Sequence, residues 1–482
     1  MEKTEKEKIG FEEKSSPAPM KLNCRHYLIF PVVFGVYFSL IINGYVQGEW
    51  TQMMVRREYF PDESANFSGC TNNNESDPRY KDYQTVQQVT ANWGMLFSLA
   101  EHIPATFAQM ILPPYTDVYG RKFLLVFGCL AMAIKNVAIS FTVYYEASFW
   151  YLFAANVVLG CGGTGFAFGS ACFSYTADIT FTKTQRTIGV VATEAMIMIA
   201  VVASSYCSGL FIEDLDLGFF YTSVIGSSFT LLMVLLILLL GESLPAEKRS
   251  KHKPIIENIK RMTDFYISKD FEGKRKAYIL LVITFGMATI ITINRGSMET
   301  LYFLGRPFCW GPSKIGLFSM VRHAAKTACG LVSIWFLQKF LSNAAIGMIG
   351  SMSSIISYTI EGLATTTVWI YMVPVTGIFT FLIVPMIRTL MSALTPLDKQ
   401  GSMFAGAATI EVICTLIAHL SQNAIYSFSL SFMNGFVFLM CAVFSLVNLL
   451  LMYFIKRTKQ GQETCQETDA TVSSKKLESE KF

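Results

Sequence analysis

The sequence has 482 residues, of which 52% are hydrophobic, 14% aromatic and 15% charged. Soluble globular chains are about one quarter charged, so this composition excludes an ordinary soluble protein and indicates a polytopic membrane protein. The net charge of +4 is small, and we expect no nucleic-acid partner. The cysteines form no CxxC pair or metal-type spacing, and no nucleophile–base pairing stands out. We therefore expect neither an enzyme nor a cofactor or metal site.

Residues 1–26 are polar and lack the apolar core of a cleavable signal peptide, so the first apolar run is expected to stay in the bilayer as an anchor. A membrane-spanning helix needs roughly 20 mostly apolar residues. Windows of this kind predict twelve spans, at 27–46, 92–113, 123–143, 149–175, 188–211, 219–240, 277–302, 314–337, 342–361, 365–388, 401–424 and 432–455.

The twelve spans divide into two groups of six. A bundle over 27–240 is followed by a basic linker at 241–276, a second bundle over 277–457 and a polar tail at 458–482 that we expect to be disordered. The linker is expected to lie partly helical along the membrane surface, as a solvated tether or in contact with anionic lipid. Two related halves of six spans are typical of alternating-access transporters.

The basic residues of the loops predict the orientation. One set of connections carries the lysines and arginines, at Arg121, Lys122, Lys183, Arg186, Lys339, Lys399, Lys456, Arg457 and Lys459. The other set includes "YYEA", "EDLDLG" and "SQNAIYSFSL", which hold no base. Because cytoplasmic loops are enriched in lysine and arginine, we expect the first set and both termini to face the cytosol.

The long loop predicted at 47–87 on the outer side supports this orientation. It carries two N-glycosylation sequons, at Asn66 and Asn74. Cys70 lies in the same loop, and Cys309 lies in the other outer connection "GRPFCWGPS". In an oxidising compartment these two cysteines could form a disulfide, and the alternative is a pair of free thiols.

The stretch "DVYGRK" lies between the second and third spans and contains Asp117, Gly120, Arg121 and Lys122. The spacing D-x-x-G-R-K at this place resembles the signature loop of the major facilitator superfamily, although Pro113 stands where a glycine is usual. The resemblance implies two six-helix bundles around a cavity that opens alternately to each face. An acid beside two bases could pair with the other half and latch the cytosolic side.

A narrower resemblance rests on "FCWGPSKIGLFSMVRH", "VPMIRTLMSALTPLDKQGSMFA" and "GSACFSYTADIT". These segments are similar to solute carrier family 46, the group that contains the proton-coupled folate transporter. The likeness runs over essentially the whole membrane region. It implies that Cys70 and Cys309 are the outer disulfide pair of the family.

Placing an ionisable residue within a membrane span costs free energy, so such residues usually face a cavity or a partner. The spans contain Glu101, His102, Lys135, Glu194, Arg295, Glu299, Arg322, His323, Lys326, Arg388, Glu411 and His419. Glu194 has no other charge in its span, and a carboxyl group in such surroundings could exchange a proton at mildly acidic pH. The resemblance implies that it is the proton-coupling carboxylate. The alternatives are a neutral acid hydrogen-bonded between helices or a partner of Lys135.

His323 lies near the outer end of the eighth span and titrates where an acidic exterior differs from the cytosol. The resemblance implies a proton-sensing role, and the alternative is a histidine that caps polar groups. Arg322 and Lys326 are four residues apart on one helix face and could attract an anion. They depart from the less charged helix of the folate transporter, so the pH response and the substrate could differ.

Arg388 lies near the cytosolic end of the tenth span. Its guanidinium suits a carboxylate or phosphate, and the resemblance implies a role in substrate and proton binding. The alternative is a membrane-edge arginine. Asp178, at the end of "SYTAD", resembles a family acid at the cytosolic end of the fourth span. It could instead pair with Lys183 or Arg186.

Together these features predict a secondary transporter that couples inward proton movement to an organic anion such as a folate. The fifth span lacks the glycine- and proline-rich motif that antiporters of this superfamily often carry, which favours symport or uniport. A lysosomal exporter of conjugated or nucleotide-like anions is the second hypothesis. A transport-inactive receptor or scaffold on the same fold is the third. The sequence leaves the plasma membrane and the endolysosomal membrane both open.

Overall fold

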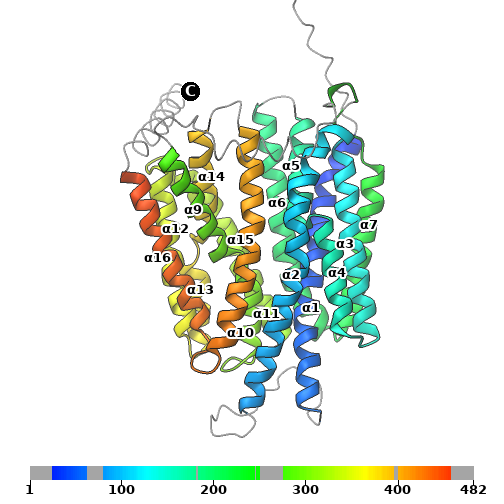
Figure 1. The fold of residues 1–482 in the computed structure, drawn as a ribbon, viewed down its shortest axis with the longest axis vertical. Helices are drawn as coiled ribbons and strands as arrows, with labels where there is room; N and C mark the ends of the chain where they lie inside the picture. Colours follow the sequence, from blue (N-terminus) through cyan, green and yellow to red (C-terminus); the bar gives the residue numbers. More distant parts are fainter. Residues whose placement is uncertain are drawn as a thin grey trace, which may run out of the picture.

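The structure is a computed structural model that describes residues 24–61, 80–180, 183–244, 246–249, 275–395 and 400–457. Within these ranges every regular element is helical, and none of the described residues belongs to a β-strand. Figure 1 shows two groups of helices that run roughly side by side. The predicted all-α fold is therefore confirmed.

The N-terminal half runs from α1 to α7. Its elements are η1 (Cys24–Leu28), α1 (Ile29–Tyr59), α2 (Tyr80–Tyr119), α3 (Arg121–Tyr144), α4 (Phe149–Cys161), α5 (Thr164–Asp178), α6 (Lys183–Gly209), the π-helical η2 (Leu210–Asp214), α7 (Gly218–Leu239) and η3 (Ala246–Lys248). α4 and α5 form one broken span. At the break Gly163 has a φ of +79°, and a Cβ on Gly162 would lie 2.4 Å from the Cβ of Ala131 in α3. Glycine thus lets this span lie close to α3.

The C-terminal half runs from α9 to α16. Its elements are α9 (Arg275–Thr292), α10 (Arg295–Leu304), α11 (Pro312–Leu337), α12 (Asn343–Leu363), α13 (Thr367–Thr376), η4 (Thr380–Leu382), α14 (Ile383–Leu394), α15 (Gln400–Ser429) and α16 (Phe436–Arg457). Two spans are broken here. Ile293 and Asn294 separate α9 from α10, and the chain bends by 42° between α13 and the η4–α14 segment. Non-helical backbone at membrane depth is tolerated only inside protein or beside a cavity, so both breaks mark polar interior sites.

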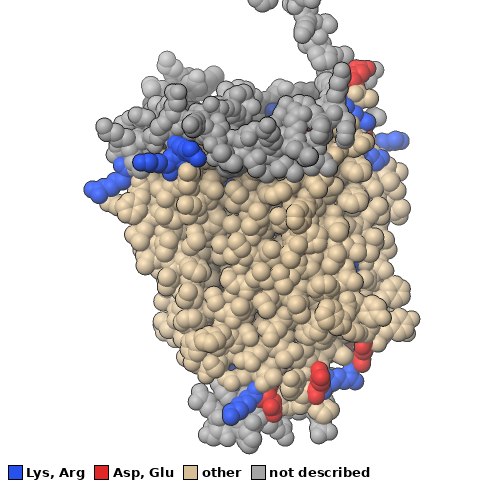
Figure 2. All heavy atoms as spheres, in the orientation of Figure 1, with Lys and Arg blue, Asp and Glu red and all other residues tan. Residues whose placement is uncertain are grey.

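Most of these helices could cross a bilayer. Among the described residues nine helices are long and apolar enough, and the bent pair α13 and α14 makes ten. α11 and α12 are more polar because α11 carries Arg322 and Lys326 and α12 carries four serines. Each of the twelve predicted spans coincides with a helix or a broken helix pair. Figure 2 shows the charged side chains at the two rims of the molecule, with a broad uncharged band between them.

The helices at the first outer connection are longer than predicted. The expected loop at 47–87 is wrong in extent, because α1 continues to Tyr59 and α2 begins at Tyr80. Polar residues alone do not end a helix, whereas the residue before a proline disfavours helical backbone, and α1 ends just before the Phe60–Pro61 step. The remaining residues 62–79, with the predicted Asn66, Cys70 and Asn74, lie outside the described residues.

The helices end at two opposite faces of the molecule, and each face is named here by the helix ends that lie on it. We call the end where α1 begins and α16 ends the terminal face, and the other end the opposite face (Figure 1). The halves meet along two seams, one between α2 and α15 and one between α6 and α11. At the first seam the side chains of Gln84 and Gln88 donate hydrogen bonds to the carbonyls of Leu430 (2.6 Å) and Ser427 (3.2 Å).

The second seam is closed by carboxylates. The backbone N–H of Ser313 donates to Glu213 and its hydroxyl donates to Asp214, both at 2.8 Å. Deeper in the same seam the Thr327 hydroxyl contacts the sulfur of Met198 at 3.6 Å. Among the described residues, the hydrogen bonds that join the halves therefore lie between mid-span and the opposite face.

Candidate functional site

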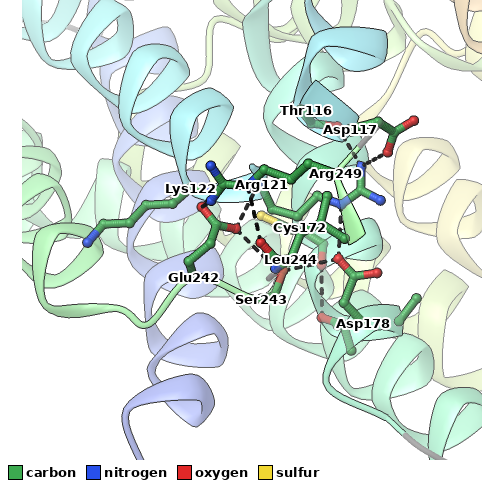
Figure 3. Close-up of polar contacts among 12 residues, drawn as sticks. Thr116, Asp117, Arg121, Lys122, Cys172, Asp178, Glu242, Ser243, Leu244 and Arg249 are labelled. Carbon is green, nitrogen blue, oxygen red and sulfur yellow. Dashed lines mark hydrogen bonds and ion pairs between the residues drawn. The ribbon is translucent and has the colours of Figure 1, made fainter. Parts of the chain in front are cut away.

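A cluster of charged side chains lies at the terminal face of the N-terminal half (Figure 3). Arg121, the first residue of α3, is at its centre. Its guanidinium contacts Asp117 of α2 at 2.6 Å and Asp178, the last residue of α5, at 2.9 Å. The planar guanidinium can hold two carboxylates at once. The structure thus brings three of the predicted gate residues together.

Glu242 completes this cluster. Its carboxylate accepts hydrogen bonds from the backbone N–H groups of Arg121 (2.8 Å) and Lys122 (3.3 Å), the first two residues of α3. A carboxylate at a helix N-terminus pairs donors that have no partner within the helix. Sequence reasoning missed Glu242. The sequence feature that marks Glu242 is an acid directly after the sixth apolar run, in "LLLGES".

Gly120 and Lys122 shape the turn between α2 and α3. Gly120 has a φ of +102° and a ψ of 160°, and a Cβ there would lie 2.3 Å from the Glu242 carboxylate. This conformation is essentially restricted to glycine. The Lys122 ammonium donates to the carbonyls of Leu238 (2.6 Å) and Leu240 (3.0 Å), where the end of α7 leaves carbonyls unpaired.

The contacts of this cluster stay within one half of the molecule. The partners that the structure describes for Asp117, Arg121 and Lys122 come from α2, α3, α5 and the chain at and after the end of α7. Asp178 additionally accepts from the Ser243 hydroxyl at 3.1 Å. The predicted latch between the two halves is not formed among these residues and stays a prediction for another conformation.

A second charged group spans the two halves. In the C-terminal half, Arg388 of α14 pairs with Glu411 of α15 at 2.5 Å and lies over the Phe285 ring of α9. The charges of Arg388 and Glu411 both act on Glu194 of α6 in the N-terminal half. Its side chain is exposed, and it forms no hydrogen bond or ion pair with any described residue. Glu194 and Glu411 each lie eleven residues from the start of their helices, about 16 Å along the axis, which is mid-membrane depth.

The acid and base in the second and third spans pair with each other. Lys135 of α3 lies 3.3 Å from Glu101 of α2, so the alternative pairing of Lys135 with Glu194 is wrong. Next to Glu101, the ring of His102 lies 5.0 Å from the ring of His419 on α15. This histidine pair lies in the seam between the halves.

The C-terminal half contains a buried network of four charges. Arg295, at the start of α10, pairs with Glu299 at 2.5 Å and with Glu361 of α12 at 2.6 Å. Arg322 of α11 lies 2.7 Å from the second oxygen of Glu299. Glu361 is fully buried and was missed by sequence reasoning, although an acid in the apolar stretch "SYTIEGL" is visible in the sequence.

The two remaining predicted residues of α11 lie beside this network. Arg322 donates to the Nε2 atom of His323 at 3.3 Å when that ring is neutral. Lys326 lies one turn further along the helix and forms no hydrogen bond or ion pair with any described residue. At the opposite face Cys309 is disulfide-bonded, and its predicted pairing with Cys70 stays a prediction because Cys70 is not described.

The chain is similar to curated members of solute carrier family 46. It is 23% identical over 442 residues to the human lysosomal proton-coupled steroid conjugate and bile acid symporter SLC46A3, covering 90% of this chain and 95% of that protein. The chicken (Gallus gallus) protein of the same name is 25% identical over 461 residues, covering 93% and 98%. The bovine proton-coupled folate transporter is 23% identical over 436 residues, covering 90% and 93%. The predicted resemblance to this family is confirmed.

Solved structures share the fold. The human organic anion transporter MFSD10 (TETRAN) superposes with a TM-score of 0.61 at 10% identity, covering 89% of this chain and 99% of that one. A D-xylose–proton symporter gives a TM-score of 0.61 at 14% identity, covering 87% and 97%. The family model of the Major Facilitator Superfamily matches residues 81–419. With this match over most of both halves, and with the helical architecture described above, the chain belongs to the Major Facilitator Superfamily.

Proposed function

We propose that this chain is a secondary active transporter that moves an organic anion together with protons by alternating access. Its family and its curated relatives are transporters and not enzymes. The single observation that carries the proposal is the Arg388–Glu411 ion pair at mid-membrane depth, whose charges act on Glu194 in the other half. Arg388 thus pairs with one carboxylate, Glu411, and its charge acts on a second, Glu194, at the place where the halves separate.

The charge balance of this site links proton and anion binding. When all three groups are ionised, Glu194, Glu411 and Arg388 carry a net charge of −1. Excess charge at membrane depth is costly, and one proton removes it. A substrate anion that contacts Arg388 adds a further negative charge and so favours proton uptake by Glu194 or Glu411. Such linkage is reciprocal, so protonation also favours binding of the anion.

His323 is the second proton site of the proposal. Its neutral ring accepts a hydrogen bond from Arg322 at 3.3 Å. A protonated ring has no acceptor and would place two positive charges side by side. Protonation of His323 therefore breaks this contact, while Arg322 keeps its ion pair with Glu299.

The terminal-face cluster has a supporting role in this proposal. Arg121, Asp178 and Glu242 tie α2, α3, α5 and the segment after α7 together, so these elements move as one unit when the halves rearrange. In an alternate conformation we expect Asp117 to meet the other half and close this side.

We further propose that the terminal face is cytosolic, with both chain termini on this side. The lysines and arginines of the loops favour this orientation. Because the hydrogen bonds between the halves lie toward the opposite face, the described conformation corresponds to an inward-open state. The relatives are described as lysosomal or as folate transporters, so an endolysosomal exporter of conjugated anions is the second candidate function. Imaging of a tagged chain separates this location from the plasma membrane.

The proton coupling can be tested by uptake of a labelled organic anion into proteoliposomes with an imposed proton gradient. We expect uptake to rise when the side that supplies substrate is acidic and to fall when the gradient is collapsed. Glu194→Gln should abolish this response while substrate exchange without a gradient continues. Glu146→Gln is the matched control, because Glu146 lies exposed at the opposite face beside Arg57. Uptake that does not change on collapse of the gradient would refute the proposal.

A further inference from the structure

A small pocket lies inside the C-terminal half, beside both of its broken spans. Its lining includes Arg295, Arg322, Lys326, Tyr358, Gly377 and Thr380. The α9–α10 break supplies Arg295, and the α13–α14 bend supplies Gly377 and Thr380. The pocket is separate from the Arg388–Glu411 pair, which is carried by α14 and α15.

The formal charges around the pocket do not cancel. Arg295, Arg322 and Lys326 are three cations, and the acids that pair with this group are Glu299 and Glu361. The two carboxylates are already occupied by the two arginines. Lys326 has no hydrogen bond or ion pair among the described residues, so one positive charge is left without a counter-charge. Lys326 is half-buried, and because charges withdrawn from water are normally paired, its uncompensated charge indicates a site for an anion.

Arg322 has unused hydrogen-bonding capacity at the same place. Its side chain is 6% exposed and its Nε–H has no hydrogen-bond partner. Its terminal nitrogen is 2.7 Å from Glu299, but that carboxylate oxygen accepts no well-aligned hydrogen bond. The contact is therefore an ion pair that leaves donors of Arg322 free. Next to the pocket, Asn294 is 1% exposed and neither polar atom of its amide has a partner.

The pocket borders the seam between the halves. Thr327, the neighbour of Lys326, contacts Met198 of α6. Met198 lies one helical turn from Glu194 on the same helix. A molecule held between the halves could thus place one end in this pocket.

We propose that the pocket binds the oxyanion head group of the transported molecule, a carboxylate or a sulfate, through Lys326 and the free donors of Arg322. This inference rests on the proposed function and adds to Arg388 a second place at which the substrate is held. Arginine and lysine both bind such oxyanions by charge-assisted hydrogen bonds. The recognised class is then an organic anion that carries a carboxylate or a sulfate at one end.

The proposed anion site can be tested by measuring the equilibrium binding of small molecules to the full-length chain in lipid nanodiscs. The probes are a steroid sulfate, folate and the unconjugated steroid. We expect Lys326→Gln to weaken binding of the sulfate or of folate about 10- to 100-fold and to change binding of the unconjugated steroid less than twofold. Lys326→Arg should stay within a few-fold of wild type. Lys314→Gln, on the first turn of the same helix beside Trp310, is the matched control and should bind as wild type.

A measurement on the wild-type chain covers the case in which a variant does not fold. An amine-acetylating reagent is applied with and without each probe, and modification of Lys326 is read by mass spectrometry. Protection by an anionic probe and not by the unconjugated steroid supports the inference. Unchanged binding by Lys326→Gln, absent protection, or failure of the wild type to bind either anion would overturn it. Proton-driven uptake of another anion in those cases would leave the proposed function standing.

Discussion

The seam between α6 and α11 is held at very short range, and a single methyl group should open it. Gly316 of α11 faces the backbone of α6, where a Cβ would lie 2.5 Å from the carbonyl oxygen of Ser205. Ordinary contacts begin at 3.4 Å, so Gly316→Ala requires α11 to move away by about 0.9 Å (3.4 minus 2.5). The carbonyl belongs to a helix backbone and cannot swing aside.

The cost of this movement can be worked from the hydrogen bonds of the seam. Ser313 donates to Glu213 and Asp214 at 2.8 Å, and a shift of this size stretches both contacts beyond hydrogen-bonding range. Each contributes about 1 kcal/mol at an exposed edge. A loss of roughly 2 kcal/mol changes the ratio of closed to open seam about 30-fold.

Hydrogen–deuterium exchange on the full chain in nanodiscs measures this directly. We expect amides near Ser313 and Glu213 to exchange roughly 30-fold faster in Gly316→Ala. Gly48→Ala is the control, because no atom lies within 4 Å of a Cβ at that helical position. Equal exchange in wild type and Gly316→Ala would show that the reasoning about this seam is wrong.

Three further substitutions test other parts of the structure. Gly120→Ala forces a side chain into a glycine-only conformation and against a carboxylate, and should destabilise the fold by about 3 kcal/mol; an unchanged thermal midpoint in detergent would contradict this. Glu361→Ala leaves Arg295 without one of its buried partners and should lower the stability of the fold by about 3–5 kcal/mol. We expect this variant to lose the monodisperse species in size-exclusion chromatography. Glu361→Gln should retain more of that species. Arg388→Gln frees Glu411 and should weaken anion binding about 10-fold; wild-type affinity in a binding assay would exclude the proposed contact.

The positions of most spans could be predicted because apolar length is a local property of the sequence. The ends of the helices could not, since α1 and α2 continue into polar segments. Apolarity locates the membrane, whereas the end of α1 depends on the residue before Pro61, which disfavours helical backbone.

The charged residues of the candidate sites could be found, but most of their partners could not. Asp117 and Arg121 are only four residues apart, so their pairing is local and visible in the sequence. Arg121 and Glu242 are 121 positions apart, and Arg295 and Glu361 are 66 positions apart. Such pairings depend on how helices pack, which no local pattern records.

The two seams between the halves are chemically unequal. At α2 and α15 the acceptors are the carbonyls of Leu430 and Ser427, which carry no net charge. At the other seam the acceptors are the carboxylates of Glu213 and Asp214 in η2, which directly follows α6. Because salt screens exposed charges, ionic strength in the solution that bathes this side weakens the edge held by carboxylates and leaves the edge held by neutral groups nearly unchanged.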